Sequence, residues 1–372
     1  MTDLSKILPP AIRSNMVEGI NGLGVHVLES GGDQGTRPCL LLLHGFPELA
    51  FSWRHLMVPL ADAGYRVIAP DLRGYGRTTG WGDAYDVDLT PWTFEHLISD
   101  LVELVSRLGI DRVASVIGHD FGSPLAGWCT LARPDIFRSV VLMSAPFAGV
   151  AANAPDRRGA DLNIELEQLS PARQHYQHYF SSPAAASDMA GAPDEVAGFL
   201  HAYFYAKSAA WPGNQPHPLE EMTALSLARL PTYYVMHLGE TMPATVAAYR
   251  SEDGPPSCPW LTHEELMVYG QEYSRTGFQG GLNWYRARLQ GIGTAFAQRF
   301  AGRKIERPGH YIAGTSDWGM YQTPGVFQAM PLAFGDWRGT SLVDQAGHWV
   351  QQEQPEQVIL ALKKFLSGLS DG

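Results

Sequence analysis

The pentapeptide GHDFG at residues 118–122 places an aspartate between two glycines, directly after the apolar run VASVI at 113–117. A strand that turns sharply into a helix holds its turn residue in a strained conformation, with the side chain exposed above the sheet. Such a turn is crowded, and Gly118 and Gly122 lie two residues either side of Asp120. The spacing is that of the nucleophile elbow G-x-S-x-G, with aspartate in the serine position. Taken alone, the pentapeptide fits a nucleophile and a helix N-cap about equally well.

Two downstream residues decide between these interpretations. An aspartate nucleophile forms an ester, which is hydrolysed by water that a base activates, and an acid holds that base. The order expected along the chain is nucleophile, acid, histidine. Asp317 follows a predicted strand in GTSDWG (314–319), and His348 lies in the loop QAGHWV (345–350) after the last predicted strand. Asp317 alone could be a turn residue and His348 is one of thirteen histidines. Together with Asp120, their order and positions predict a catalytic triad.

Ester hydrolysis also develops negative charge on the carbonyl oxygen of the aspartate, and two backbone N–H groups can stabilise it. Phe121, the residue after the nucleophile, supplies one of them. The turn HGFP (44–47), directly after a predicted strand, supplies the other through the amide of Phe46. No G-x-S-x-G motif follows a predicted strand, so a serine esterase would lack its nucleophile.

Composition restricts the class of protein. Of 372 residues, 45% are hydrophobic and 17% are charged, which is typical of a globular protein. The formal net charge of −11 and the scattered Lys and Arg argue against nucleic acid or a membrane surface as partner. Three widely spaced cysteines indicate free thiols in a reducing compartment, and no Cys/His cluster suggests zinc. The N-terminal sequence lacks the apolar stretch of a signal peptide, so we expect a cytoplasmic protein.

The elements that position these residues follow from the alternation of apolar runs with amphipathic segments. We expect a hairpin over 16–30, strands over 39–45, 65–71, 113–120 and 139–147, and helices over 55–64, 94–109 and 123–134. Strands that alternate with helices predict a mostly parallel sheet covered on both faces.

The pattern changes between residues 148 and 297, where short helical segments rich in Tyr, Trp and Pro replace the strands and where ten of the fifteen tyrosines lie. Strands return over 310–315 and 340–349, and an amphipathic helix over 354–369 closes the chain. The prediction is one α/β core formed by residues 1–147 and 298–372, interrupted by a mostly helical cap domain over 148–297.

At this point the sequence resembles the epoxide hydrolases of the α/β-hydrolase fold superfamily. The resemblance covers most of the chain, and it is carried by the segment beginning HGFP (44–78), by GHDFG, by NWYR (283–286) and by GHWVQQEQP (347–355). Together, HGFP, GHDFG and GHWVQ are specific for the branch that uses an aspartate nucleophile. The resemblance implies an α/β-hydrolase core with an inserted helical cap, or lid.

Haloalkane dehalogenases share the first step of this branch, carboxylate attack on a saturated carbon, and differ in how the leaving group is stabilised. An epoxide oxygen needs acidic O–H donors, whereas a halide needs weak donors such as an indole N–H, commonly from a Trp directly after the nucleophile. That position is Phe121, which has no side-chain donor, and the arginine of fluoroacetate-type dehalogenases is absent too. The resemblance therefore favours an epoxide hydrolase. A haloalkane dehalogenase and a non-catalytic ligand-binding protein on the same fold remain the alternatives.

The resemblance also implies two cap tyrosines that bind the epoxide oxygen. NWYR gives Tyr285, and HYQHYF (175–180) gives Tyr176, whose position in the pattern Tyr-Gln-x-Tyr-Phe favours it over Tyr179. The segment 205–260 matches no motif, and it is expected to shape the entrance or a subunit contact.

The implied reaction converts an epoxide into a vicinal diol. Tyr176 and Tyr285 bind the oxygen while Asp120 attacks a ring carbon, and the His348/Asp317 pair then activates the water that hydrolyses the ester. Every step has a protein group assigned to it, so we expect no cofactor and no metal. The expected partners are a small hydrophobic epoxide and water. The natural epoxide, its preferred enantiomer and the oligomeric state stay open, a homo-oligomer included.

Overall fold

An eight-stranded sheet forms the centre of the computed structural model, which describes residues 3–32, 37–150, 159–192, 195–250 and 258–369. The strand order is β1-β2-β4-β3-β5-β6-β9-β10. The strands are β1 (Arg13–Ile20), β2 (Leu23–Ser30), β3 (Cys39–Leu43), β4 (Arg66–Pro70), β5 (Val113–His119), β6 (Val140–Met143), β9 (Ile305–Gly314) and β10 (Phe334–Val343). From β4 to β10 all neighbouring strands are parallel, whereas β2 is antiparallel to both of its neighbours.

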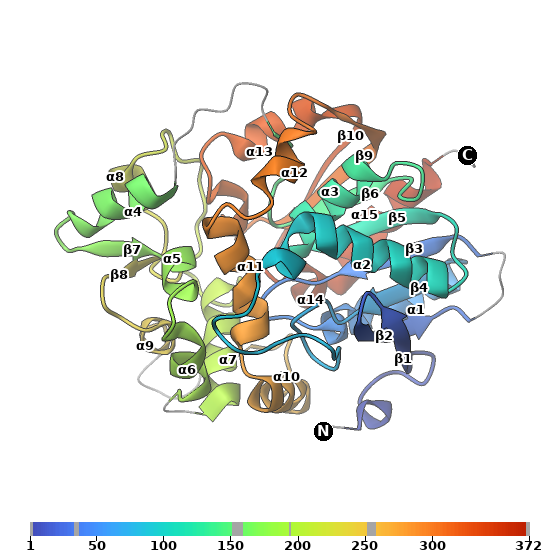
Figure 1. Cartoon of the computed structure of the whole chain (residues 1–372), viewed down its shortest axis with the longest axis horizontal. Coiled ribbons are helices and arrows are strands. Elements are labelled where there is room, and N and C mark those ends of the chain that lie inside the picture. Colours follow the sequence, from blue (N-terminus) through green and yellow to red (C-terminus); the bar gives the residue numbers. More distant parts are fainter. Residues whose placement is uncertain (1–2, 33–36, 151–158, 193–194, 251–257, 370–372) are drawn as a thin grey trace.

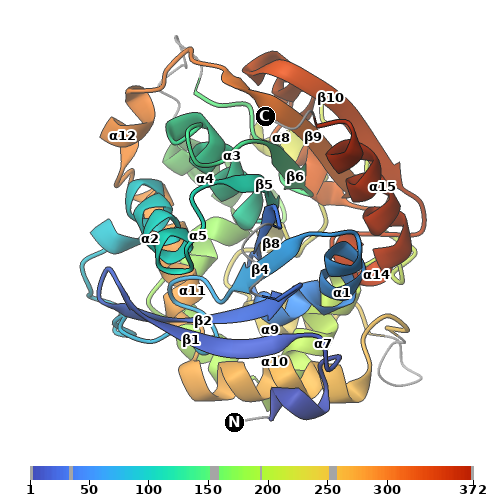
Figure 2. The ribbon, with the colours of Figure 1, turned by 90° about the vertical axis from the view of Figure 1, so that its right-hand side faces the viewer.

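Helices cover both faces of this sheet, as Figure 2 shows, with α2 and α3 on one side and α1 and α15 on the other. This double cover explains why all five residues of β3, the run CLLLL, are buried. The helices of the core are α1 (Arg54–Asp62), α2 (Phe94–Arg107), α3 (Gly122–Ala132), α13 (Val326–Ala329), α14 (Val350–Glu353) and α15 (Pro355–Ser367). Short 3-10 helices span Leu4–Lys6, Ala50–Trp53, Thr90–Trp92, Trp318–Tyr321 and Met330–Ala333.

The segment between β6 and β9 lies to one side of the sheet, at the left of Figure 1. Its elements are α4 (Gly159–Glu167), β7 (Arg173–His175), α5 (Tyr176–Phe180), α6 (Ala185–Ala190), α7 (Glu195–Lys207), α8 (Ala224–Leu227), β8 (Val235–His237), α9 (Met242–Ala247), α10 (His263–Thr276), α11 (Gln279–Leu289) and α12 (Thr294–Gln298). The predicted class, a mostly parallel α/β sheet with an inserted helical region, is confirmed. The division into a core of residues 1–147 and 298–372 and a cap of 148–297 stays our proposal.

Several predicted elements end at other residues than expected. The strand predicted over 139–147 stops at Met143, because Ser144 has a φ of 66° and leaves the extended conformation. The strand predicted over 340–349 begins earlier and ends at Val343. In its sequence FGDWRGTSLV only Phe334 and Val343 are buried and the positions between them are half-buried or exposed at the edge of the sheet, so it presents no continuous apolar run. The two-stranded pair of β7 and β8 was not predicted, since each strand has only three residues.

Polar and charged side chains join the cap helix α10 to the core. The carboxylate of Glu265 lies 2.7 Å from Nε of Arg54, and Glu272 lies 2.8 Å from Nε of Arg77. Next to these pairs, the hydroxyl of Tyr269 lies 2.8 Å from the hydroxyl of Ser52. The cap is therefore held to the core by directional contacts as well as by apolar packing.

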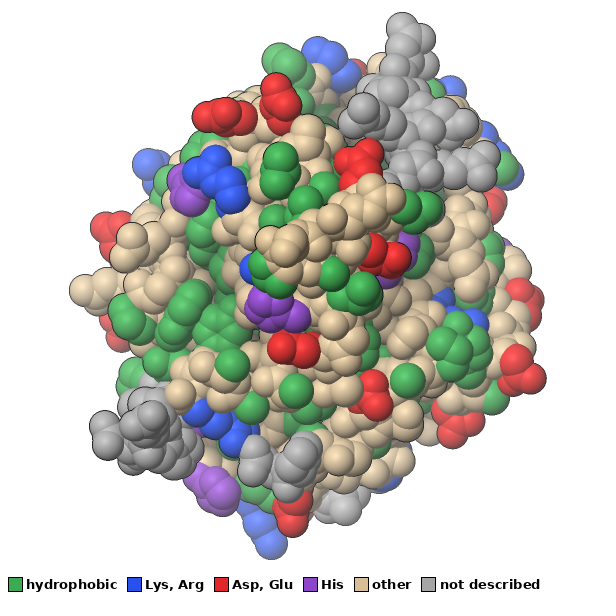
Figure 3. Space-filling view, turned by 90° about the vertical axis from the view of Figure 1, so that its left-hand side faces the viewer, with side chains coloured by type: hydrophobic (Ala, Val, Ile, Leu, Met, Phe, Trp, Pro, Cys, Tyr) green, Lys and Arg blue, Asp and Glu red, His purple; other side chains and the backbone are tan. Residues whose placement is uncertain are grey.

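The outer face of the cap carries charged side chains of both signs, scattered among hydrophobic ones (Figure 3). Within the described residues, no helix is long and apolar enough to cross a membrane. The three cysteines are buried and unpaired, as expected. Across the same described ranges, no group of three or more His, Cys, Asp or Glu side chains is arranged to hold a metal ion.

Candidate active site

Asp120 lies in the turn between β5 and α3 with a φ of 51°, a left-handed conformation that is uncommon for a residue with a side chain. The turn is so tight that a Cβ on Gly118 would overlap the carbonyl oxygen of Gly122. A Cβ on Gly122 would in turn overlap the carbonyl oxygen of Leu43 on the neighbouring strand. The two glycines of the pentapeptide are therefore required by backbone contacts, and the turn has the geometry of a nucleophile elbow.

Both oxygens of the Asp120 carboxylate face a predicted partner. The amide of Phe46 donates a hydrogen bond of 3.0 Å to Oδ1, and Nε2 of His348 lies 3.2 Å from Oδ2. A Cβ on Gly45 would overlap this carboxylate, so the HGFP turn approaches the nucleophile through a glycine. The structure thus brings together residues from three separate segments that the sequence analysis assigned to one site.

The other ring nitrogen of His348 faces the predicted acid. Nδ1 lies 3.1 Å from Oδ1 of Asp317, and this oxygen also accepts a 2.6 Å hydrogen bond from the amide of Gly319. The hydroxyl of Ser144, at the end of β6, lies 2.7 Å from the same Nδ1. Two groups therefore orient the imidazole, and Nε2 points toward Asp120.

Burial and nearby positive charges act in opposite directions on the pKa values of Asp120 and Asp317. Burial alone raises the pKa of the Asp120 carboxyl, but the hydrogen bond and charge of His348, followed by the charge of Lys207, outweigh it and leave the pKa below its ordinary value. Burial likewise raises the pKa of Asp317, and the charge and hydrogen bond of His348 reverse that effect. Both carboxylates are therefore ionised at neutral pH, as a nucleophile and a histidine-orienting acid require.

A second buried pair, His119 and Glu48, holds the loop that carries His348. Nε2 of His119 donates a 2.6 Å hydrogen bond to the carbonyl oxygen of His348, and Nδ1 lies 2.6 Å from Oε2 of Glu48. Both acceptors are oxygens without protons, so both ring nitrogens donate and the imidazole is positively charged. Burial lowers the pKa of His119, but the charge and hydrogen bond of Glu48 outweigh it and raise the pKa. Oε1 of Glu48 accepts hydrogen bonds from Gln351 and Gln352.

Lys207 is a buried cation close to the triad. Its ammonium group lies over the rings of Tyr203, Tyr234 and Trp349, with distances of 4.8–5.3 Å from the ring centroids. Burial lowers the pKa of Lys207 to about 8, while the charges of Asp120, Asp317 and Glu48 act in the opposite direction. Its carbonyl oxygen accepts a 2.9 Å hydrogen bond from the amide of His348.

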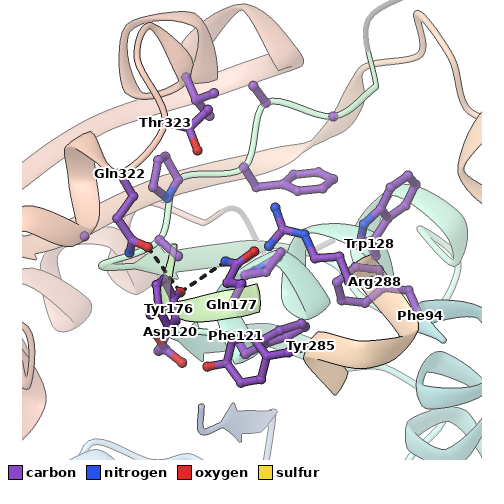
Figure 4. Close-up of a pocket in the computed structure, with 18 residues that line it drawn as sticks. Phe94, Asp120, Phe121, Trp128, Tyr176, Gln177, Tyr285, Arg288, Gln322 and Thr323 are labelled. Atoms are coloured by element: carbon purple, nitrogen blue, oxygen red, sulfur yellow. Dashed lines mark hydrogen bonds between the residues drawn. The ribbon is translucent and has the colours of Figure 1, made fainter. Parts of the chain in front are cut away.

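A cavity of about 340 Å³ opens above Asp120, between the core and the cap (Figure 4). Aromatic rings dominate its wall. The lining residues are Phe94, Asp120, Phe121, Pro124, Trp128, Ala145, Pro146, Phe147, Ala148, Gly149, Tyr176, Gln177, Tyr285, Arg288, Gly319, Gln322, Thr323 and Val326. Phe121, whose amide was predicted as the second oxyanion donor, packs its ring edge-on against Tyr285 at a centroid distance of 5.2 Å.

Two tyrosines named in the sequence analysis line this cavity from the cap. The rings of Tyr176 and Tyr285 lie 5.9 Å apart. The Tyr176 hydroxyl donates a 3.2 Å hydrogen bond to Gln322 and accepts one of 3.1 Å from Gln177. Burial, and next the charge of Asp120, raise the pKa of both tyrosines, so both hydroxyls carry their protons at neutral pH. Tyr179 points elsewhere, since its hydroxyl donates a 3.0 Å hydrogen bond to Asp188.

Sequence reasoning missed Ser144, Glu48, His119 and Lys207. Glu48 and His119 stand beside quoted motifs, in HGFPE and GHDFG, but their pairing depends on a contact across 71 positions of the chain. Ser144 directly follows a strand of the parallel sheet, which is a favoured position for functional residues. Lys207 ends α7 in a region where no motif was found.

Known proteins resemble this chain over nearly its whole length. A family model described as alpha/beta hydrolase fold matches residues 38–175. The chain is 34% identical over 350 residues to epoxide hydrolase A of Mycobacterium tuberculosis, and the match covers 94% of this chain and 96% of that protein. The chain belongs to the epoxide hydrolases. Among solved structures, an epoxide hydrolase from an endophytic Streptomyces superposes with a TM-score of 0.79 at 28% identity, covering 98% of both chains.

A plant relative has the same fold. Potato epoxide hydrolase I superposes with a TM-score of 0.73 at 27% identity, over 96% of this chain and all of that one. Membership of this family of epoxide hydrolases confirms the resemblance drawn from HGFP, GHDFG, NWYR and GHWVQQEQP.

The elbow generates a prediction about stability. Gly118→Ala is expected to lower the free energy of unfolding by about 1–3 kcal/mol, because the new methyl group overlaps the backbone of Gly122. Urea unfolding followed by circular dichroism measures the loss. Gly368→Ala is the matched control, since its Cβ would lie 3.5 Å from the nearest atom, an ordinary contact, and its effect should stay within about 0.5 kcal/mol. Equal effects of the two substitutions would contradict the account of the turn.

The buried lysine generates a prediction about pH. Lys207→Met removes a positive charge that favours the ionised form of Asp120, so the pKa of Asp120 should rise toward its ordinary value. If Asp120 forms the ester expected from the sequence, that step needs the carboxylate, and its rate should begin to fall at a higher pH than in the wild type as the solution is acidified. Single-turnover stopped-flow measurements against pH test this. Lys304→Met, at an exposed position, serves as control, and identical pH profiles for all three proteins would refute the prediction.

Proposed function

We propose that this chain converts an epoxide to a vicinal diol through a covalent ester on Asp120. The observation that carries the proposal is the position of the Asp120 carboxylate, which has the Phe46 amide on one oxygen and His348 Nε2 beside the other. The same carboxylate lines the cavity into which Tyr176 and Tyr285 project (Figure 4).

In the first half-reaction, Oδ2 of Asp120 attacks a ring carbon of the epoxide and the bond from that carbon to the ring oxygen breaks. The oxygen acquires negative charge, and the hydroxyls of Tyr176 and Tyr285 donate hydrogen bonds to it, one of them passing its proton across. Both hydroxyls are protonated before the reaction, which makes them donors, whereas the depressed pKa of Asp120 keeps the nucleophile ionised. The product is a hydroxyalkyl ester on Oδ2.

In the second half-reaction, water attacks Cγ of Asp120 while His348 removes one of its protons. Asp317 stabilises the imidazolium that results, and Ser144 helps to keep the ring in place. The charge on Oδ1 of the tetrahedral intermediate is stabilised by the Phe46 amide and, in this proposal, by the Phe121 amide. The bond between Cγ and Oδ2 then breaks, the departing alkoxide takes the proton of the hydroxyl just added to Cγ, and the diol leaves the regenerated Asp120 carboxylate. The proton held by His348 restores the tyrosine hydroxyl.

The decisive experiment uses His348→Gln, which should form the ester without hydrolysing it. After incubation with a panel of epoxides, the intact mass should increase by the whole mass of an epoxide, and the modified peptide should contain Asp120. The double variant Asp120→Asn/His348→Gln is the control and should gain no mass. After incubation with a haloalkane, release of halide ion together with an alkyl adduct that lacks the halogen would instead indicate dehalogenase chemistry. An unmodified protein after exposure to both classes would refute the mechanism.

The two tyrosines are expected to contribute separately. Tyr285→Phe should slow ring opening by about 10- to 100-fold, because a hydrogen bond to a charged group typically contributes roughly 1.5–3 kcal/mol, and Tyr176 remains. Tyr176→Phe should cause a loss of similar size, and the double variant should show no turnover. Single-turnover kinetics measure each rate constant.

The matched control is Tyr179→Phe, because the Tyr179 hydroxyl is bound to Asp188 outside the cavity. Near wild-type turnover is expected. A larger loss with Tyr179→Phe than with Tyr176→Phe would reverse the assignment of the first tyrosine.

A further inference from the structure

A groove of about 730 Å³ lies in the core at the opposite edge of the sheet from Asp120. Its lining includes four arginines and one aspartate. Arg112, one of these arginines, directly precedes β5, whereas Asp120 directly follows the same strand. A strand of seven residues spans about 23 Å. The groove is therefore separate from the catalytic cavity, and the two share no lining residue.

Three of the arginines reach the groove from the amino ends of adjacent strands. Arg112 directly precedes β5, Arg138 lies two residues before β6, and Arg307 is the third residue of β9. These strands are parallel and lie side by side in the order β5-β6-β9. Neighbouring strands are about 4.8 Å apart, so the sheet itself places the three positive charges next to one another.

Hydrogen bonds hold two of these guanidinium groups together. Nη1 of Arg138 and Nε of Arg307 donate bonds of 3.3 Å and 3.0 Å to the same acceptor, the carbonyl oxygen of Pro134. Burial, and then the charges of Arg307 and Arg112, lower the pKa of Arg138, so the groups are close enough to repel one another. Among the residues that the structure describes, no carboxylate forms an ion pair with any of the three.

Other arginines at this end of the core have carboxylate partners. Arg338, the fourth arginine of the groove, donates hydrogen bonds of 2.5 and 2.8 Å to the two oxygens of Asp336. Arg66, the neighbour of Tyr65 in the chain, donates a 2.8 Å hydrogen bond to Glu29. The chain has 38 acidic residues against 27 basic ones, so carboxylates are abundant. A cluster of three arginines without one is the arrangement expected of a site that binds an anion from solution.

A phosphate monoester matches this cluster better than a carboxylate does. It carries a charge of about −1.5 to −2 at neutral pH and has three terminal oxygens that accept hydrogen bonds, so each guanidinium can bind one of them. A carboxylate has one charge and two oxygens, which a single arginine satisfies. Next to the arginines, the ring of Tyr65 and the side chains of Leu366 and Leu369 also line the groove. They provide an apolar surface for the organic part of such an ester.

We propose that the groove binds an organic phosphate, with the phosphate held by Arg112, Arg138 and Arg307 and the apolar part against Tyr65 and the two leucines. A soluble phosphate ester and the headgroup of a phospholipid share this chemistry. The proposal concerns binding alone, and it is independent of the reaction at Asp120.

The test is isothermal titration calorimetry of the full chain with phenyl phosphate as the probe. The wild type should bind it at one site, and more tightly than inorganic phosphate, which has no group to place against Tyr65. Arg138→Met should raise the Kd for phenyl phosphate by about 10- to 100-fold, because a hydrogen bond between charged groups is lost. Lys304→Met, which removes an exposed positive charge outside the groove, is the matched control and should keep the wild-type Kd.

Urea unfolding separates a binding role of Arg138 from a structural one. Without phosphate, Arg138→Met should be at least as stable as the wild type, since the substitution removes one of three charges that repel one another. A second variant avoids any effect on folding. Arg112 is exposed and forms no hydrogen bond within the described part of the chain, and Arg112→Met should raise the Kd by about two- to fivefold.

Arg288→Met distinguishes the groove from the catalytic cavity, which Arg288 lines. It should bind phenyl phosphate as the wild type does. Sedimentation with vesicles of phosphatidylcholine and phosphatidic acid identifies the source of the ligand: pelleting that depends on Arg138 indicates a phospholipid, and protein that stays in the supernatant indicates a soluble ester. Absence of phenyl phosphate binding, or binding that Arg288→Met abolishes and Arg138→Met does not, would overturn the proposal.

Discussion

A negative charge buried beneath the cap is the constraint on which the rest of this structure depends. Removing a carboxylate from water costs several kcal/mol unless partners compensate for it. At Asp120 the compensation comes from the Phe46 amide on one oxygen, from His348 beside the other and from the charge of Lys207 farther away. The same contacts are those that the proposed chemistry uses, because a donor that stabilises the carboxylate on Oδ1 also faces the oxyanion of the tetrahedral intermediate.

Buried polar groups hold the backbone of the loop that carries His348. His119 binds its carbonyl oxygen, the carbonyl of Lys207 binds its amide, and the carboxylate of Glu353 accepts the amides of Gly347 and Trp349. These contacts, one of which comes from Lys207 of the cap, fix the backbone on both sides of the imidazole, so its ring nitrogens can face Asp317 and Asp120. As the proposed base, His348 would keep its orientation while substrates of different shape enter.

The cap contributes the tyrosines and, with them, the environment of the substrate. In the proposed mechanism, α11 presents the hydroxyl of Tyr285 to the ring oxygen, and Arg288 of the same helix lines the same cavity. In the same proposal the core supplies the nucleophile, the base and the acid.

The sequence alone determined the fold class, the strand-turn-helix at Asp120, the order of Asp120, Asp317 and His348, and the family, because each of these depends on local spacing and chain order. Strands β3 and β5 were readable since burial on both faces makes their sequences continuously apolar. The edge strand β10 was misplaced because it lacks that signal. Only the tertiary structure decided that Tyr176 and not Tyr179 lines the cavity, and that Ser144 and the pair of His119 and Glu48 support His348. These facts depend on contacts between residues far apart in the chain, and such contacts leave no periodicity in the sequence.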